Sequence, residues 1–124
     1  MMIAHPLVSV VDDDESVRES LPDLLKEFGY SARAFSSAEE FLASQYLDQT
    51  NCLILDVAMP GMTGPELHRE LIRRSCNIPV VFITAQGNDK IRASVLELGA
   101  VECLSKPFSD AALLGALNAA FGVC

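Results

Sequence analysis

The chain has 124 residues, of which half are hydrophobic and 21% are charged, so it fits one folded domain over residues 1–124 and is too apolar for a disordered chain. Lys and Arg number 9 against 17 Asp and Glu, and the formal charge of −8 disfavours direct binding of nucleic acid or an anionic membrane by this domain. No apolar run approaches the length of about 20 residues that spans a bilayer, and the start lacks a secretory signal, so we expect a cytoplasmic protein.

Five runs of strand length follow one another along the chain. The first, third and fourth are apolar and nearly continuous, which is typical of parallel strands covered on both faces, and the fifth is weaker. The second run alternates and contains Arg33, so it is predicted to be an edge strand. In chain order the runs are Leu7–Val11, Ser31–Phe35, Cys52–Leu55, Val80–Ile83 and Val101–Leu104.

Segments between and after these runs have apolar residues at helical spacing. The clearest are Val17–Phe28, Leu67–Ile72, Ile91–Leu98 and Leu113–Phe121. Pro22 lies inside the first segment, where it should bend the helix. End signals support the pattern: Ser37 with Glu40 forms a possible capping box, Pro65 fits a first helical turn, and Gly29 and Gly99 fit positions just after helices.

Strands that alternate with helices predict an α/β fold, a doubly wound (βα)5 sheet with helices on both faces. In such sheets the ligand site lies at the carboxyl ends of the strands. Four of the five runs are followed there by polar residues, and the strand order 2-1-3-4-5 would bring them together. They are Asp12, Asp13 and Asp14 after the first run, Asp56 after the third, Thr84 after the fourth, and Ser105 and Lys106 after the fifth.

The charges of this group call for a cation. Asp12, Asp13 and Asp56 with Lys106 sum to −3 + 1 = −2, and carboxylates at short range resist joint ionisation. Hard oxygen ligands favour Mg²⁺ over zinc, and a metal, a lysine and a hydroxyl around one aspartate suit phosphoryl transfer. Each feature alone has an ordinary explanation, because aspartates often begin helices or form turns. The interpretation therefore depends on the combination.

Four motifs resemble the receiver domain of two-component response regulators, and most closely those receivers that precede a helix-turn-helix DNA-binding domain. They are Val10–Asp14, Leu55–Gly64, Ile83–Ala85 and Lys106–Phe108. The resemblance covers essentially the whole chain and implies a flavodoxin-like fold. It also implies a phosphorylation-activated switch that modifies itself, rather than a turnover enzyme.

The resemblance implies a role for each site residue. Asp56 would accept the phosphoryl group from a sensor histidine kinase, and Mg²⁺ would be held by Asp12, Asp13, Asp56 and the backbone carbonyl of Ala58. Lys106 would pair with a phosphoryl oxygen.

Switching would involve Thr84, whose hydroxyl would bind another phosphoryl oxygen. Cys103 occupies the position where receivers usually have an aromatic residue that rotates inward on activation, so we expect weaker coupling here. The Lys106–Pro107 bond would be cis.

The resemblance also implies which surface and partners carry the signal. The output surface would comprise the helical segment Ile91–Leu98, the strand Val101–Leu104 and the helical segment Leu113–Phe121. It would act on an attached or cognate helix-turn-helix output domain that controls transcription, or form a phosphorylation-dependent homodimer.

Two other functions remain open from the sequence alone. One is a flavodoxin-like or phosphatase-like enzyme that uses Asp56 as a covalent nucleophile, which the absence of a cap domain or a Gly-rich phosphate loop disfavours. The other is a degenerate receiver that serves only for dimerisation, which the intact polar set disfavours.

The remaining candidate ligands are interpreted as structural. Cys52, Cys76, Cys103 and Cys124 are widely spaced without a Cys-x-x-Cys pair, and the two in or beside apolar runs should be small buried hydrophobic residues. His5 and His68 match no site position and are predicted to be solvated surface residues.

Overall fold

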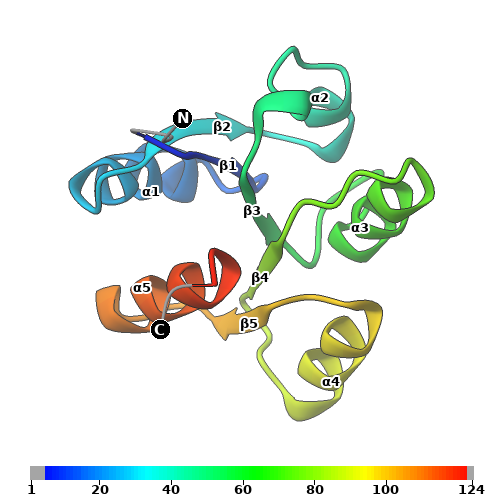
Figure 1. The fold of residues 1–124 in the computed structure, drawn as a ribbon. Coiled ribbons are helices and arrows are strands. Elements are labelled where there is room, and N and C mark those ends of the chain that lie inside the picture. Colours follow the sequence, from blue (N-terminus) through cyan, green and yellow to red (C-terminus); the bar gives the residue numbers. More distant parts are fainter. Residues whose placement is uncertain (1–4, 123–124) are drawn as a thin grey trace.

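Five parallel strands form one sheet in the computed structural model, which describes residues 5–122. The strand order is β2-β1-β3-β4-β5, and all four neighbouring pairs are parallel, which confirms the predicted topology (Figure 1). The strands are β1 (Leu7–Val11), β2 (Ser31–Phe35), β3 (Cys52–Asp56), β4 (Val80–Thr84) and β5 (Glu102–Ser105).

Helices cover both faces of the sheet, as the sequence predicts. Helices α1 and α5 lie on one face, and α2, α3 and α4 lie on the other (Figure 1). Their bounds are α1 (Glu15–Glu27), α2 (Ala38–Leu42), α3 (Gly64–Arg73), α4 (Asp89–Leu98) and α5 (Asp110–Ala120), with a 3₁₀ turn at Leu47–Gln49. Within residues 5–122, none of the helices combines the length and the apolar character needed to cross a membrane.

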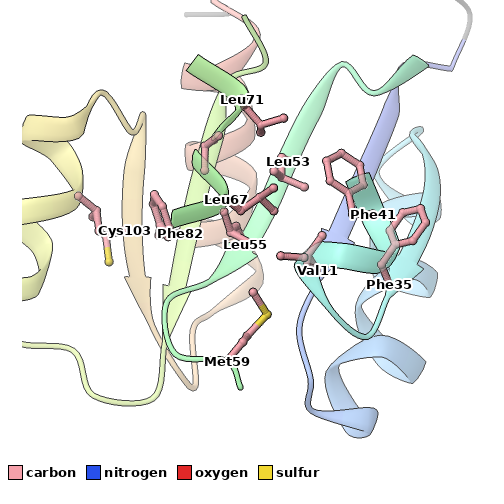
Figure 2. Packing of buried hydrophobic residues seen from close by; sticks show 13 residues of the cluster. Val11, Phe35, Phe41, Leu53, Leu55, Met59, Leu67, Leu71, Phe82 and Cys103 are labelled. Carbon is pink, nitrogen blue, oxygen red and sulfur yellow. The ribbon is translucent and has the colours of Figure 1, made fainter. Parts of the chain in front are cut away.

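The hydrophobic core has two halves because successive strand residues point to opposite faces of the sheet. Val10 and Ile54 pack toward α1 and α5, whereas Val11 and Leu55 pack toward α2 and α3. Figure 2 shows the second half, where Phe35 and Phe41 lie near the β2 edge and Cys103 lies toward the β5 side. Every residue of the central strands β3 and β4 is buried, which explains their continuous apolar sequence.

The helix ends largely follow the predicted signals. Gly29 and Gly99 have positive φ angles of 98° and 117°, and Pro65 lies in the first turn of α3. The Ser37 hydroxyl accepts the Glu40 N–H at 3.0 Å, but the Glu40 carboxylate accepts the N–H of the preceding residue, Ser36, so the box at α2 is incomplete. Helix α1 continues through Pro22, and the bend there stays a prediction.

Two residues of α3 contradict their predicted environments. His68 is only 5% exposed, its ring lies 5.7 Å from that of Phe82, and its Nδ1 atom has no hydrogen-bond partner among residues 5–122. Ile72, predicted on the apolar stripe, is 50% exposed. The buried face of α3 runs through Leu67, His68 and Leu71, so it is rotated away from Ile72. His5 is exposed, as predicted.

Candidate functional site

Residues from four strand ends line one open cavity of about 320 Å³ at the carboxyl edge of the sheet. Asp12 and Asp13 follow β1, Asp56 ends β3, Thr84 ends β4, and Lys106 follows β5. The central strands lie side by side, and their register places Asp56 opposite Ile83, one residue before Thr84. The cavity is lined by Asp12, Asp13, Asp14, Asp56, Val57, Ala58, Thr84, Ala85, Gln86, Ile91 and Lys106.

Asp12 is completely buried, and several groups hold it in place. One carboxylate oxygen accepts the backbone N–H of Asp14 at 2.9 Å, and the other accepts the Lys106 ammonium at 2.8 Å. The Arg18 guanidinium, from the first turns of α1, donates to the Asp12 backbone carbonyl at 3.0 Å. The residue is therefore fixed through its side chain and its backbone.

Asp56 is 5% exposed and lies among like charges. One oxygen from each of Asp12, Asp13 and Asp56 falls within 4.8 Å of the others. Burial, followed by the charge of Asp12, raises the pKa of Asp56 from 3.8 to about 7, although the nearby Lys106 opposes the shift. Without a cation, the pocket thus keeps Asp56 protonated in mildly acidic solution, and the carboxyl ionises only as the pH approaches neutrality.

Lys106 is shared unequally between two carboxylates. Its ammonium lies 2.8 Å from Asp12 but 3.8 Å from Asp56, so it is a direct partner of Asp12 only. Burial lowers the pKa of Lys106, but the hydrogen bond and charge of Asp12, together with the charges of Asp56 and Asp14, outweigh it, and the pKa is raised overall. Lys106 therefore stays charged. The peptide bond between Lys106 and Pro107 is cis, as predicted.

Thr84 is 3% exposed and directs its hydroxyl toward the start of the β4–α4 loop. The hydroxyl oxygen accepts the Gln86 N–H at 3.1 Å, which leaves its own proton available for another acceptor. The Thr84 carbonyl accepts the Lys106 N–H at 2.8 Å, so the ends of β4 and β5 are joined beside the cavity.

The loop after Asp56 begins at the edge of the cavity. Ala58 lines the cavity, and Met59 returns to the core with 7% exposure. The chain then reverses at Gly61, where φ is +74°, a left-handed value that glycine adopts without steric cost. At Gly64, a Cβ atom would lie 2.1 Å from the Asp56 carbonyl oxygen, so only glycine allows the loop to return this close to β3.

This donor set fits Mg²⁺. The available atoms are the carboxylate oxygens of Asp12, Asp13 and Asp56, which are hard ligands, and the open cavity leaves room for water. Three carboxylates with one lysine leave a charge of −2, which a divalent cation balances.

The structure brings six of the sequence-predicted site residues into this cavity: Asp12, Asp13, Asp56, Ala58, Thr84 and Lys106. Cys103 does not line it. That residue is 7% exposed and borders a separate hollow of about 100 Å³, where its carbonyl accepts a hydrogen bond from Arg92 of α4. Arg18 was missed by the sequence reasoning, because an arginine on α1 carries no signal that it binds the carbonyl of Asp12.

Comparison with known proteins identifies the family. Residues 8–118 match the family model described as the response regulator receiver domain. Nodulation protein W of Bradyrhizobium diazoefficiens is 45% identical over 114 residues, which cover 92% of this chain and 50% of that protein. Transcriptional regulatory protein FixJ of Azorhizobium caulinodans is 39% identical over 115 residues, covering 93% and 54%. The chain spans about half the length of these curated relatives.

Solved structures agree with this assignment. The response regulator StyR superposes with a TM-score of 0.86 at 44% identity, over 96% of this chain and 60% of that one. The structure called FixJ-N gives a TM-score of 0.84 at 35% identity, over 95% and 94%. The chain belongs to the response regulator receiver domain family, with its flavodoxin-like fold, and therefore to the signalling proteins of two-component systems.

Proposed function

We propose that this chain is a phosphorylation-activated switch in which Asp56 accepts a phosphoryl group from the phosphohistidine of a sensor histidine kinase. The observation that carries the proposal is the cavity in which Asp56 lies beside two further aspartates, a lysine and a threonine hydroxyl. The chain would modify itself rather than turn over a substrate.

The transfer uses Asp56 as the nucleophile. A carboxylate oxygen forms a bond to phosphorus, the phosphorus–nitrogen bond to the donor imidazole breaks, and its electron pair stays on that ring. Asp12, Asp13, Asp56 and the Ala58 carbonyl would hold Mg²⁺. Bound Mg²⁺ would supply the positive charge that lets a dianionic group approach this acidic cavity.

Lys106 and Thr84 would recognise the transferred group. The ammonium already lies 3.8 Å from Asp56, so a short movement would pair it with a phosphoryl oxygen. The Thr84 hydroxyl retains a proton that it can donate to a second oxygen. Because Thr84 also accepts the Gln86 N–H, a change at the hydroxyl would reach the β4–α4 loop directly.

The signal would leave through the surface formed by α4, β5 and α5. Residues 85–90, which form the β4–α4 loop and the start of α4, are all exposed and follow the switch residue immediately. Such a segment can be reordered by new contacts at its start. The partner would be an attached or cognate helix-turn-helix output domain that regulates transcription in the cytoplasm, or a second copy of the chain.

Labelling tests the assignment of Asp56. The purified chain is incubated with a small acyl-phosphate donor, with Mg²⁺ or with a chelator, and its intact mass is measured. We expect the wild type to gain one phosphoryl group only with Mg²⁺, and Asp56→Asn to gain none. Equal labelling of both proteins would contradict the proposal, and steady turnover of donor without a labelled protein would favour the enzyme alternative.

A further inference from the structure

The β3–α3 loop, residues 57–63, contributes Val57 and Ala58 to the lining of the cavity. The loop is fixed near its beginning, because the Met59 side chain is 7% exposed in the core. It is fixed again at its end, where the Gly64 N–H donates to the Val57 carbonyl at 3.1 Å. The turn at Gly61 lies between these two anchors.

A carboxylate from α2 holds this turn. The Oε2 atom of Glu39 accepts the Met62 N–H at 3.1 Å. A Cβ atom on Gly61 would lie 2.9 Å from the same oxygen, so the glycine leaves the room that the carboxylate occupies. Within residues 5–122, this is the one hydrogen bond that joins residues 58–63 to an element other than α3.

The neighbouring Glu40 has a different and purely local task. Its carboxylate accepts the Ser36 N–H at 2.8 Å, and its own N–H donates to the Ser37 hydroxyl, so both contacts stabilise the start of α2. Glu39 makes neither of these contacts. Of these two adjacent acidic residues, Glu40 therefore stabilises the start of α2, whereas Glu39 stabilises the β3–α3 loop.

We propose that Glu39 is a positioning residue for the cation side of the cavity, because it fixes the loop to which the Ala58 carbonyl belongs. The inference rests on the proposed function, in which that carbonyl is a Mg²⁺ ligand. A loop that is already ordered loses little conformational freedom when the ion binds. Without the bond to Met62, ordering the loop would oppose ion binding, as for other outer partners of metal ligands.

The test compares Mg²⁺ affinity, measured by NMR titration, with hydrogen exchange of the Met62 amide in the metal-free protein. We expect Glu39→Ala to bind Mg²⁺ about threefold to tenfold more weakly and to exchange the Met62 amide faster. Glu39→Gln should restore both values, because its amide oxygen accepts the same hydrogen bond. Glu40→Ala is the matched control and should keep wild-type Mg²⁺ affinity although α2 loses a cap.

Three results would overturn the inference. The first is wild-type affinity in Glu39→Ala, and the second is an equal loss in Glu39→Ala and Glu40→Ala, which would trace the effect to α2 itself. The third is a Glu39→Gln variant as weak as Glu39→Ala, which would assign the effect to charge. Failure of the wild type to bind Mg²⁺ would instead contradict the proposed function, and Met62 exchange would then still decide whether Glu39 holds the loop.

Discussion

Asp56 lies in an environment that opposes its own ionisation. Burial and the Asp12 charge raise its pKa from 3.8 to about 7, and Lys106 is committed mainly to Asp12. Between these two pKa values the folded protein binds more protons at Asp56 than the unfolded chain does. The contribution of protonated Asp56 to folding stability is therefore fully present below about pH 4 and is lost as the pH rises through about 7.

In the presence of a chelator at about pH 8, we therefore expect Asp56→Asn to raise the free energy of unfolding by up to about 4 kcal/mol. The gain should shrink toward about pH 5, and Mg²⁺ should reduce it by favouring the wild-type carboxylate. Urea unfolding at several pH values, with chelator or Mg²⁺, measures these differences. Asp48→Asn, at an exposed position outside the cavity, is the control and should show no such gain. A pH-independent gain in Asp56→Asn would contradict the account.

His68 has the opposite linkage. Burial lowers its pKa below the ordinary value of 6.5, so the unfolded chain takes up the proton more readily than the folded protein. Stability from neutral His68 is therefore present above about pH 6.5 and is lost as the pH falls below it. The unpartnered Nδ1 atom adds a cost at every pH, because a buried polar atom without a partner is unfavourable.

Replacing His68 with leucine should thus stabilise the protein by about 1 kcal/mol near pH 8, and by more as the pH falls. The quantity to follow is the difference in unfolding free energy between variant and wild type, because the contribution of Asp56 cancels in it. His5→Ala, at an exposed histidine, serves as the control and should keep the wild-type profile. A difference that stays constant with pH would show that His68 does not titrate in this range.

At the scale of elements, the strands could be predicted from the sequence, but the buried face of α3 and the bounds of α2 could not. Runs such as Val80–Ile83 are apolar because both faces of the strand are covered. The run of apolar residues is therefore enough to predict the strand. The buried face of α3 depends on how the helix rolls against β4, so His68 and Ile72 were assigned to the wrong faces. Helix α2 has only five residues, and its spacing was too short to define it.

The β4–α4 loop approaches Ser105, the last residue of β5, so closely at Gly87 that a side chain there would clash. A Cβ atom on Gly87 would lie 1.6 Å from the Ser105 hydroxyl oxygen and 2.6 Å from the Ser105 Cβ. Gly115, in the interior of α5, is a useful contrast, because a Cβ atom there meets nothing within 4 Å. The same substitution should therefore have opposite effects at the two positions.

We expect Gly87→Ala to destabilise the protein by about 1–3 kcal/mol through overpacking. Gly115→Ala should stabilise it by about 0.5–1 kcal/mol, because alanine is the better helix former. Adding Ser105→Gly to Gly87→Ala removes the obstructing atoms and should recover part of the loss. Thermal unfolding of the four proteins measures this, and a neutral Gly87→Ala would mean that the loop can move away from β5 without cost.

For the molecule as a whole, parallel topology made the site predictable. Once the strands are ordered, Asp12, Asp56, Thr84 and Lys106 must meet at one edge of the sheet, whatever the details of the loops. The Glu39 contact was missed because it depends on the path of the loop after Asp56, which brings Met62 to α2 from 23 residues away. The residues that carry the chemistry of the cavity can thus be predicted from the sequence more readily than the residues that hold its loops in place.

Coupling between the cavity and the output surface depends on the space around Cys103. If Thr84 moves toward the phosphoryl group on activation, the residue at position 103 of β5 would fill the space that it leaves. A thiol buries much less apolar area than an aromatic ring, so it gains less from this movement. Arg92 meanwhile ties α4 to β5 through the Cys103 carbonyl and the Glu102 carboxylate, which favours the resting arrangement.

We therefore expect Cys103→Phe to couple phosphorylation to the output surface more tightly than the wild type. The hollow of about 100 Å³ beside Cys103 offers room for part of the ring. The added apolar area is worth about 1–2 kcal/mol, so the dimer affinity gained with a beryllofluoride phosphoryl analogue should rise about fivefold to thirtyfold above the wild-type gain. Light scattering with and without the analogue measures this gain, and Cys103→Ala, the size-reducing control, should show none beyond the wild type. If Cys103→Phe shows no larger gain, the cysteine only packs, and the β4–α4 loop carries the coupling without it.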